Sequence, residues 1–241
     1  ENIAPKGVPE LETLINGVFD KSRLLSMLRG FMVFENTGSD VIKKIAGYHQ
    51  FHAVHKAVQC TINATDDSGD NRVGVIWHTQ GSGKSLTMVF LAQVIRRNEE
   101  LKKYKLLYIT DRTQLDSQLT NTFQNTQDET VLQADSVQDL RELISKDSSD
   151  LITSTIQKFQ EIRGENLKSL NESEKIVVLI DEAHRTQYGT FGMVLNTVLP
   201  NAAKIAFTGT PLLKSELTTG EFGDYIDKYT IEQSVEDGAT L

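Results

Sequence analysis

Short apolar runs alternate with helix-length segments along most of this chain. The runs long enough to form strands lie at residues 106–110, 151–155, 176–180 and 204–208. A shorter run at residues 130–132 predicts one more strand, and helical spacing predicts helices at residues 85–97 and 137–144. Apolar runs separated by helices are typical of a parallel sheet covered on both faces. The pattern predicts an α/β fold of three layers with a mostly parallel central sheet, in which residues 204–208 form the last strand.

The first 45 residues differ from the rest, because they lack the alternation that is typical of strands. Pro9, followed by acidic residues, predicts the start of one helix. Asp20 is a suitable N-cap for a second helix, which Gly30 ends. Both helices have an apolar face. We therefore predict a helical lead-in or linker at residues 1–45 and one α/β domain at residues 46–241.

A further helix is predicted from residue 45 to residue 62, where apolar positions recur at helical spacing. It carries His49, His52 and His55 at intervals of three residues. Such positions drift around a helix, and no cysteine or carboxylate completes a set of metal ligands. Packing or exposure to solvent is therefore a better interpretation of these histidines than metal binding.

The strongest chemical signal follows an apolar segment that begins at Val73. There the chain reads Thr-Gln-Gly-Ser-Gly-Lys-Ser before a helix rich in Leu, Met, Val and Ala. A glycine-bearing turn between a strand and a helix gathers backbone N–H groups into a nest that binds phosphate, and the helix dipole assists it. The cofactor-binding residues predicted in this loop are Thr79, Gln80, Gly81, Ser82, Gly83, Lys84 and Ser85.

Two side chains of this loop have predicted roles in binding a nucleotide with Mg²⁺. Lys84 supplies a positive charge for the outer phosphates, and the Ser85 hydroxyl is a ligand for the metal ion. The usual phosphate-loop pattern begins with glycine, whereas this chain has His78 at that position. We expect the His78 side chain to point away from the phosphates and to lie against the adjacent helix.

Composition and charge narrow the class of protein. The chain has 241 residues, of which 39% are hydrophobic and 24% charged, as in an ordinary soluble globular protein. No apolar run is long enough to span a membrane. The single cysteine, Cys60, rules out an internal disulfide and fits a reducing cytoplasm. A net charge of −8 argues against a broad basic face for nucleic acid, although a local groove remains compatible with it.

Polar residues follow the predicted strands directly, at the edge where parallel sheets bind ligands. Asp181 comes after the run at residues 176–180 and is suited to hold Mg²⁺ through water, opposite Ser85. Glu182 is placed to orient or deprotonate an attacking water molecule. His184 is a candidate to link the nucleotide state to a neighbouring segment. These residues predict a site that hydrolyses a nucleoside triphosphate.

Four segments of the chain resemble a known family. The phosphate loop, the Asp-Glu-Ala-His box and Thr-Gly-Thr-Pro occur in the order found in superfamily 2 helicases and translocases. The amino-acid sequence is most similar to that of the motor (R) subunit of type I restriction-modification enzymes at residues 77–85, 181–189, 207–212 and 222–226. The resemblance implies the first of two RecA-like motor domains. It also implies ATP and Mg²⁺ as cofactors, double-stranded DNA as a partner, and methyltransferase and specificity subunits in the parent complex.

The resemblance also assigns roles to single residues. Gln50 resembles the glutamine that recognises adenine upstream of the phosphate loop. The residues that resemble contacts to the DNA backbone are Thr110, Arg112, Thr153, Ser154 and Thr155. Those that resemble the motif coupling hydrolysis to movement are Thr208, Gly209 and Thr210.

Two parts of the family's architecture are not found in this sequence. Its endonuclease domain needs an Asp followed by Glu-x-Lys, and the one Glu-x-Lys here, Glu100-Leu101-Lys102, lies in a charged helix tail that we interpret as solvated surface. The second motor domain, which carries arginine fingers, is also missing. We therefore expect a piece of a larger subunit that translocates and cleaves DNA. Alone, this piece should bind DNA weakly and hydrolyse ATP very slowly.

Two alternatives stay open at this point. The chain could belong to another superfamily 2 motor, either a Swi/Snf-type remodeller or a type III restriction subunit, although the Thr-Gln-Gly-Ser-Gly-Lys-Ser wording disfavours both. It could also be a nucleotide-gated interaction module that never hydrolyses. Glu182 argues against that second interpretation, since a sensor needs no acid to orient water.

Overall fold

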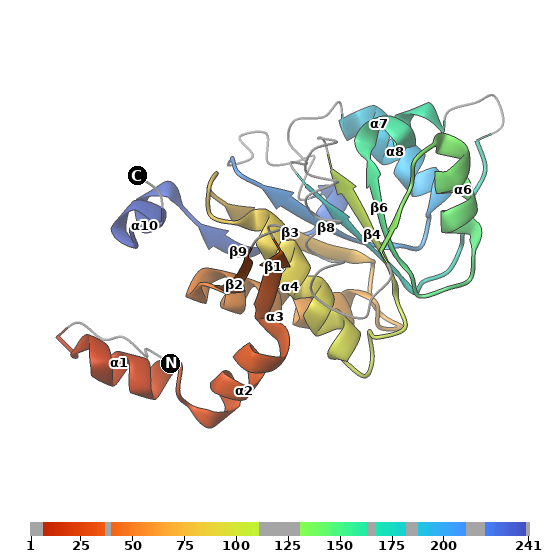
Figure 1. Cartoon of the computed structure of the whole chain (residues 1–241). Helices are drawn as coiled ribbons and strands as arrows, with labels where there is room; N and C mark the ends of the chain where they lie inside the picture. Colours follow the sequence, from red (N-terminus) through yellow and green to blue (C-terminus); the bar gives the residue numbers. More distant parts are fainter. Residues whose placement is uncertain are drawn as a thin grey trace.

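Among the residues that the structure describes, a sheet of seven strands runs through the centre of the fold. The computed structural model describes residues 7–36, 40–110, 131–162, 167–181, 188–210 and 220–239. The strands of the sheet are β3 (Arg72–His78), β4 (Lys105–Thr110), β5 (Val131–Gln133), β6 (Leu151–Thr155), β7 (Ile176–Ile180), β8 (Ala203–Thr208) and β9 (Tyr225–Tyr229). All neighbouring strands run parallel, in the order β5-β6-β4-β7-β8-β3-β9 (Figure 1). The predicted α/β fold with a parallel sheet is confirmed.

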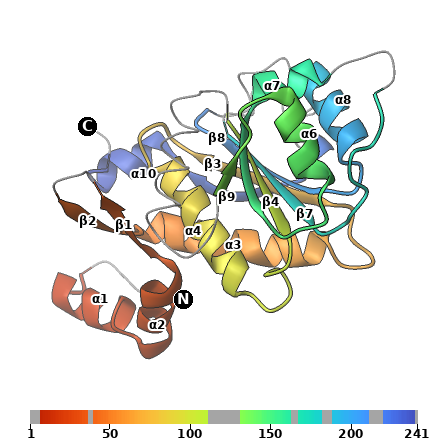
Figure 2. The ribbon, with the colours of Figure 1, turned by 45° about the vertical axis from the view of Figure 1, so that its right-hand side comes forward.

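Helices cover both faces of this sheet. They are α3 (Tyr48–Ala64), α4 (Lys84–Arg97), α6 (Val137–Ser145), α7 (Ile156–Glu161) and α8 (Tyr188–Val198). Figure 2 shows α3 and α4 on one face and α6, α7 and α8 on the other. Successive residues of β4 alternate between the two faces: Leu106 and Tyr108 pack with α3 and α4, whereas Leu107 and Ile109 pack with α6, α7 and α8. The core is therefore two apolar layers separated by the sheet.

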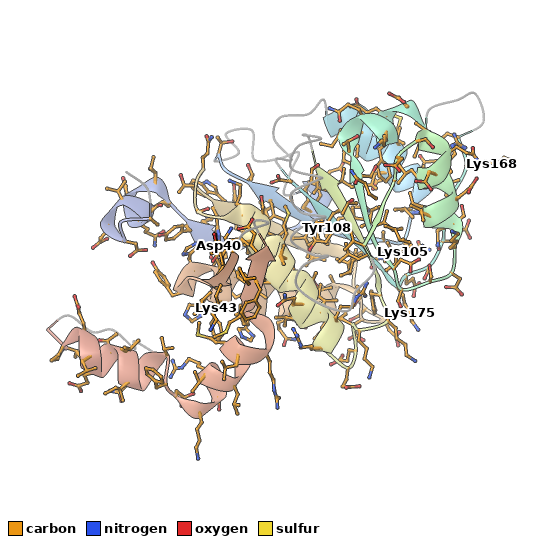
Figure 3. The ribbon with its side chains drawn as sticks, viewed as in Figure 1. Asp40, Lys43, Lys105, Tyr108, Lys168 and Lys175 are labelled. Atoms are coloured by element: carbon orange, nitrogen blue, oxygen red, sulfur yellow. The ribbon has the colours of Figure 1, made fainter. Side chains whose placement is uncertain are left out.

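Polar groups inside these layers find partners at the helices that cover them. Lys105 and Tyr108 both lie on β4 (Figure 3). The Lys105 ammonium donates to the carbonyls of Leu143 at 2.6 Å and Lys146 at 2.8 Å, at the C-terminal end of α6. A cation stabilises this end of a helix, because the last carbonyls have no partners within the helix. The Tyr108 hydroxyl donates to the carbonyl of Met88 on α4.

The N-terminal segment contains the two predicted helices, α1 (Glu10–Gly17) and α2 (Lys21–Gly30). Asp20 caps α2, because its Oδ1 accepts from the N–H groups of Ser22 and Arg23, both at 3.1 Å. The predicted cap is confirmed. Within the described ranges, none of the helices has the length and hydropathy that crossing a membrane requires.

The prediction of a helical lead-in at residues 1–45 is incomplete, because this segment also contains two strands. Strands β1 (Met32–Asn36) and β2 (Val41–Ile45) follow α2 and form an antiparallel hairpin. Val33 is the only fully buried side chain among those described in the two strands, so the hairpin gives almost no period-two signal in the sequence. Phe31, just before β1, anchors the segment, because it is buried in the same apolar cluster as α3 and α4.

A further strand, β9, follows the one predicted to be last. It lies beside β3 at the edge of the sheet and leads into α10 (Ile231–Glu236) (Figure 1). Its sequence, Tyr-Ile-Asp-Lys-Tyr, mixes polar and apolar residues, as an edge strand does, and so lacks the continuous apolar run of the central strands. The prediction that residues 204–208 form the last strand is therefore wrong.

Gly74 allows β9 to approach β3 closely. Its φ of 137° is rare for residues with a side chain, and a Cβ there would lie 2.6 Å from the Asp224 carbonyl oxygen and 2.5 Å from Ile226 Cγ1. The Asp224 oxygen cannot retreat without losing the N–H of Val75, which it accepts at 2.9 Å. We expect Gly74→Ala to lower the free energy of unfolding by about 1–3 kcal/mol. Urea unfolding followed by circular dichroism measures this change.

Gly220→Ala is the matched control for this measurement. A Cβ at Gly220 meets no atom within 4 Å, and the residue has no positive φ. We expect its free energy of unfolding to stay within about 0.5 kcal/mol of the unmodified chain. Equal stability of the Gly74→Ala and Gly220→Ala variants would contradict the close approach of β9 to β3.

Candidate nucleotide-binding site

The predicted phosphate loop joins β3 to α4. Gly81 and Gly83 have φ values of 86° and 81°, which glycine adopts without steric cost. Ser82 closes the turn, since its N–H and its hydroxyl both donate to the Thr79 carbonyl, at 3.3 and 2.7 Å. The Gly83 carbonyl accepts the first bond of α4 from the N–H of Thr87 at 3.0 Å. The N–H groups of the first helical turn have no partners within the helix, so the loop offers them to an anion.

The first turn of α3 holds this loop from one side. His49 Nε2 lies 3.0 Å from the Ser82 carbonyl oxygen, and Gln50 Nε2 donates to the Gly83 carbonyl at 3.0 Å. Gln50 Oε1 accepts from the N–H of Gly47, so the same amide also caps its own helix. A Cβ on Gly83 would lie 2.8 Å from Gln50 Nε2 and would displace this amide, and the φ of 81° at this position favours glycine. The predicted contact of Gln50 with adenine stays a prediction.

His78, at the position where the usual pattern has glycine, is completely buried. Its Nε2 lies 2.9 Å from Asp227 Oδ2 on β9, and Lys56 Nζ donates to the other carboxylate oxygen at 2.5 Å. Burial raises the pKa of Asp227, but the hydrogen bonds from His78 and Lys56 outweigh it and hold that pKa below its usual value. An ionised carboxylate only accepts, so His78 Nε2 carries the hydrogen. The hydrogen-bond partner of His78 is therefore on a strand, while its ring also contacts His49 of α3, with centroids 5.5 Å apart.

Other predicted site residues follow strands at the same edge of the sheet. Asp181 comes directly after β7 and is buried, and its N–H donates to the Ile109 carbonyl at 2.9 Å. Thr208 ends β8, and its hydroxyl accepts from the N–H of Thr210 at 3.3 Å, across Gly209. Strands β7, β8 and β3 are neighbours in the sheet. Their C-terminal ends therefore bring these residues to the edge that carries the phosphate loop.

The described residues predicted to contact DNA are all buried. Thr110 is the last residue of β4 and is paired with Thr155 of the neighbouring strand β6. Thr153 and Ser154 lie in the same strand, and both side chains are inaccessible to solvent. Side chains in this position cannot touch a DNA backbone without a rearrangement of the segments around them. Their contact with DNA stays a prediction.

The residues predicted to hold Mg²⁺ are Ser85, which is half-buried in the first turn of α4, and Asp181. A hydroxyl and a carboxylate are oxygen ligands of the kind that Mg²⁺ prefers, so the donor chemistry fits this ion. Arg112, Glu182 and His184 lie outside the described residues. Within the described ranges, no group of three or more His, Cys, Asp or Glu side chains is arranged to hold a metal ion.

The sequence did not predict the neighbours that β9 brings to the loop. The Tyr229 carbonyl accepts from the N–H of Thr79 at 2.9 Å, and the Tyr229 ring stacks on His49 with centroids 4.1 Å apart. Asp227 pairs with His78 from a position 149 residues away in the chain. The one available signal was the resemblance at residues 222–226, which runs into β9 but does not reach these side chains.

The fold and the site together define a class of protein. A phosphate loop between a strand and a helix, at the same sheet edge as a carboxylate that follows another parallel strand, is typical of a RecA-like nucleoside-triphosphate-binding domain. The chain belongs to the SWI2/SNF2 ATPase family, because the sequence model of that family matches residues 49–241.

Curated relatives of this chain are named as restriction enzyme subunits. It is 41% identical over 251 residues to the type I restriction enzyme HindI endonuclease subunit of Haemophilus influenzae, in a match covering 96% of this chain and 24% of that protein. It is 38% identical over 243 residues to the putative type I restriction enzyme MjaIXP endonuclease subunit of Methanocaldococcus jannaschii, covering 98% of this chain and 23% of that protein. The chain thus spans about a quarter of the length of these relatives.

Solved structures show the same fold. The ATP-dependent Type ISP restriction-modification enzyme LlaBIII, bound to DNA, matches 84% of this chain and 16% of its own, with a TM-score of 0.60 and 17% identity. The UvsW helicase from bacteriophage T4 matches 86% of this chain and 67% of its own, with a TM-score of 0.57 and 14% identity. These likenesses confirm the RecA-like fold.

The pair formed by His78 and Asp227 should stabilise the folded chain. We expect Asp227→Asn to lower the free energy of unfolding at pH 7 by about 1–3 kcal/mol, since buried His78 loses a charged acceptor. Lys56→Gln is the matched control. The Lys56 side chain is 56% exposed, so we expect a loss below about 1 kcal/mol. Urea unfolding of the three chains measures both differences, and equal losses for the two variants would contradict this account.

The effect of Asp227→Asn should also depend on pH. The folded-state pKa of Asp227 is lowered, so its stabilising contribution is present above the unfolded pKa of about 4. It is lost as the pH falls through the lower folded pKa. The difference in stability between Asp227→Asn and the unmodified chain should therefore shrink between pH 5 and pH 3. A difference that stays constant over this range would argue against an ionised partner for His78.

Proposed function

We propose that this chain is the first motor domain of a type I restriction enzyme R subunit, in which ATP hydrolysis drives movement along double-stranded DNA. The observation that carries the proposal is the phosphate loop, where Gly81 and Gly83 expose helix N–H groups beside Lys84, at the sheet edge that Asp181 shares. The names of the curated relatives support the restriction context. Because the chain spans about a quarter of those proteins, translocation and cleavage are proposed for the whole subunit.

In this proposal the loop binds ATP, and single residues act on its phosphates. Lys84 places its charge beside the outer phosphates. Ser85 and Asp181 hold Mg²⁺, which when bound neutralises charge on the phosphate oxygens. Glu182 orients the attacking water, and His184 links the nucleotide state to a neighbouring segment. These roles divide the site into residues that bind and residues that prepare hydrolysis.

The remaining assignments concern the parent complex. Thr208, Gly209 and Thr210 are proposed to couple hydrolysis to movement. The motor domain is proposed to comprise residues 46–241, after a lead-in at residues 1–45. Partners of the whole subunit are double-stranded DNA and the methyltransferase and specificity subunits. A reducing cytoplasm suits Cys60, the single cysteine. A Swi/Snf-type remodeller, a type III subunit and a module that does not hydrolyse are less favoured by the names of the relatives.

Removal of the Lys84 charge should abolish nucleotide binding. We expect this chain, assayed by itself, to bind ATP with Mg²⁺ weakly and to hydrolyse it very slowly, since the resemblance assigns arginine fingers, worth about 10³–10⁵ in rate, to a second motor domain. Titration with a fluorescent ATP analogue and a phosphate-release assay measure the two properties. Exposed Lys103, which precedes β4 at the opposite edge of the sheet, provides the control variant Lys103→Ala. Unchanged nucleotide binding in Lys84→Ala, or rapid turnover by the chain alone, would contradict the proposal.

The Gln50 amide should distinguish ATP from GTP. An amide can donate to and accept from the adenine edge at once, a pattern that guanine does not present. We expect the unmodified chain to prefer ATP and Gln50→Ala to narrow the difference in affinity between ATP and GTP. The loss of the hydrogen bond to Gly83 should also weaken the binding of both nucleotides equally. This effect separates support of the loop from recognition of adenine.

Gln59→Ala serves as the control for this measurement. Gln59 lies on the same helix, where its exposed amide donates to Asn63 and makes no contact with the loop. We expect it to leave both affinities unchanged. If Gln50→Ala weakens ATP and GTP by the same factor, the amide only supports the loop and does not recognise the base.

A further inference from the structure

The His49 ring lies between the phosphate loop and strand β9. Its Nε2 is 3.0 Å from the Ser82 carbonyl oxygen. Its face stacks on the Tyr229 ring, with centroids 4.1 Å apart and the planes inclined by only 4°. Its edge meets the buried His78 ring at 5.5 Å. Because a carbonyl oxygen only accepts, His49 Nε2 must carry the hydrogen of this bond.

This hydrogen bond determines where a neighbouring N–H group points. The Ser82 carbonyl and the Gly83 N–H belong to one planar trans peptide unit, so they point in opposite directions. A donor that holds the carbonyl toward α3 therefore turns the Gly83 N–H away from α3. Gln50 acts in the same way on the next peptide unit, where it holds the Gly83 carbonyl and so orients the N–H of Lys84. Two adjacent N–H groups of the phosphate loop are thus aimed by two side chains of α3.

The position of His49 is itself fixed by β9 and α10. The hydroxyls of Tyr229 and Tyr48 both donate to Asp237 Oδ2, at 2.8 and 2.7 Å. Asp237 is the C-cap residue of α10. The Tyr229 backbone is tied to the loop as well, because its carbonyl accepts from the N–H of Thr79. The ring that supports His49 is therefore held at both its hydroxyl and its backbone.

Burial favours the neutral form of the His49 ring. Burial lowers the pKa of His49 below its usual value, and the nearby His78 lowers it further, although the bond to Ser82 and the carboxylates of Asp237 and Asp227 act in the opposite sense. A neutral ring with its hydrogen on Nε2 donates to the carbonyl without bringing a full positive charge to the loop. The contact is thus a directional hydrogen bond and not a charge for the phosphates.

We infer that His49 is a positioning residue for nucleotide binding, which fixes the Ser82–Gly83 peptide unit so that the Gly83 N–H faces the phosphates. The inference rests on the proposed function of the loop as an ATP site. His49 acts on the phosphates of the nucleotide through the backbone of the loop. Its replacement therefore weakens the binding of ATP and of GTP alike. This behaviour distinguishes it from Gln50, whose proposed contact with adenine affects one base.

The test separates the hydrogen bond of His49 from its ring stack. His49→Phe keeps an aromatic ring against Tyr229 but removes the donor, and His49→Gln keeps a donor of similar reach but removes the ring. We expect His49→Phe to weaken the binding of a fluorescent ATP analogue and of the matching GTP analogue about three- to tenfold. The melting temperature of this variant should be unchanged. We expect His49→Gln to recover most of that affinity while its melting temperature falls. Titrations with Mg²⁺ and thermal unfolding give the two readouts.

Two other outcomes of this experiment would overturn the inference. Unchanged affinity in His49→Phe would overturn the inference, as would an affinity loss that His49→Gln does not recover. His52→Phe is the control on the same helix, because His52 is exposed and has no contact with the loop. It should change neither readout. Failure of the proposed function looks different: in that case the unmodified chain binds neither analogue, or Lys84→Ala binds both as well as the unmodified chain does.

Discussion

The phosphate loop must turn several backbone N–H groups toward its ligand, and the structure around it depends on this requirement. Such groups are costly when buried without a partner, so they have to face the ligand or water. Instead, the carbonyl groups of the loop accept hydrogen bonds from other groups of the protein. The carbonyls of Thr79, Ser82 and Gly83 all accept within the protein, from Ser82 itself, from His49 and from Gln50 with Thr87. With the carbonyls held, the planar peptide units leave their N–H groups on the opposite side.

The histidine that replaces glycine at the start of the loop has structural consequences of its own. Buried His78 needs a polar partner, and Asp227 supplies one from β9. Strand β9 in turn reaches β3 only because Gly74 leaves room for the Asp224 backbone. The packing of the first loop residue therefore depends on the edge strand, and the position of the edge strand depends on one glycine of β3. The edge strand also carries Tyr229, so the same packing fixes the ring against which His49 stacks.

The two faces of the sheet have different roles in this arrangement. Helices α3 and α4, on one face, both touch the loop, and α4 begins at Lys84 within it. Helices α6, α7 and α8, on the other face, pack on the strands and complete the core. The residues that resemble DNA contacts in β4 and β6 are buried between these layers. Thr110 and Thr155 are therefore almost inaccessible to solvent in the folded chain.

The sequence alone determined the parallel sheet, the phosphate loop and the N-cap of α2, because each depends on residues close together in the chain. Continuous apolar runs identify strands buried on both faces, and Asp20 caps a helix through its immediate neighbours. Only the tertiary structure decided the hairpin at residues 32–45, strand β9, and the contacts of His49 and His78. These features are marginal locally, since they bury few residues or join side chains as much as 149 positions apart. These features are stabilised by contacts between residues that are distant in the chain. Such contacts leave no local pattern in the sequence.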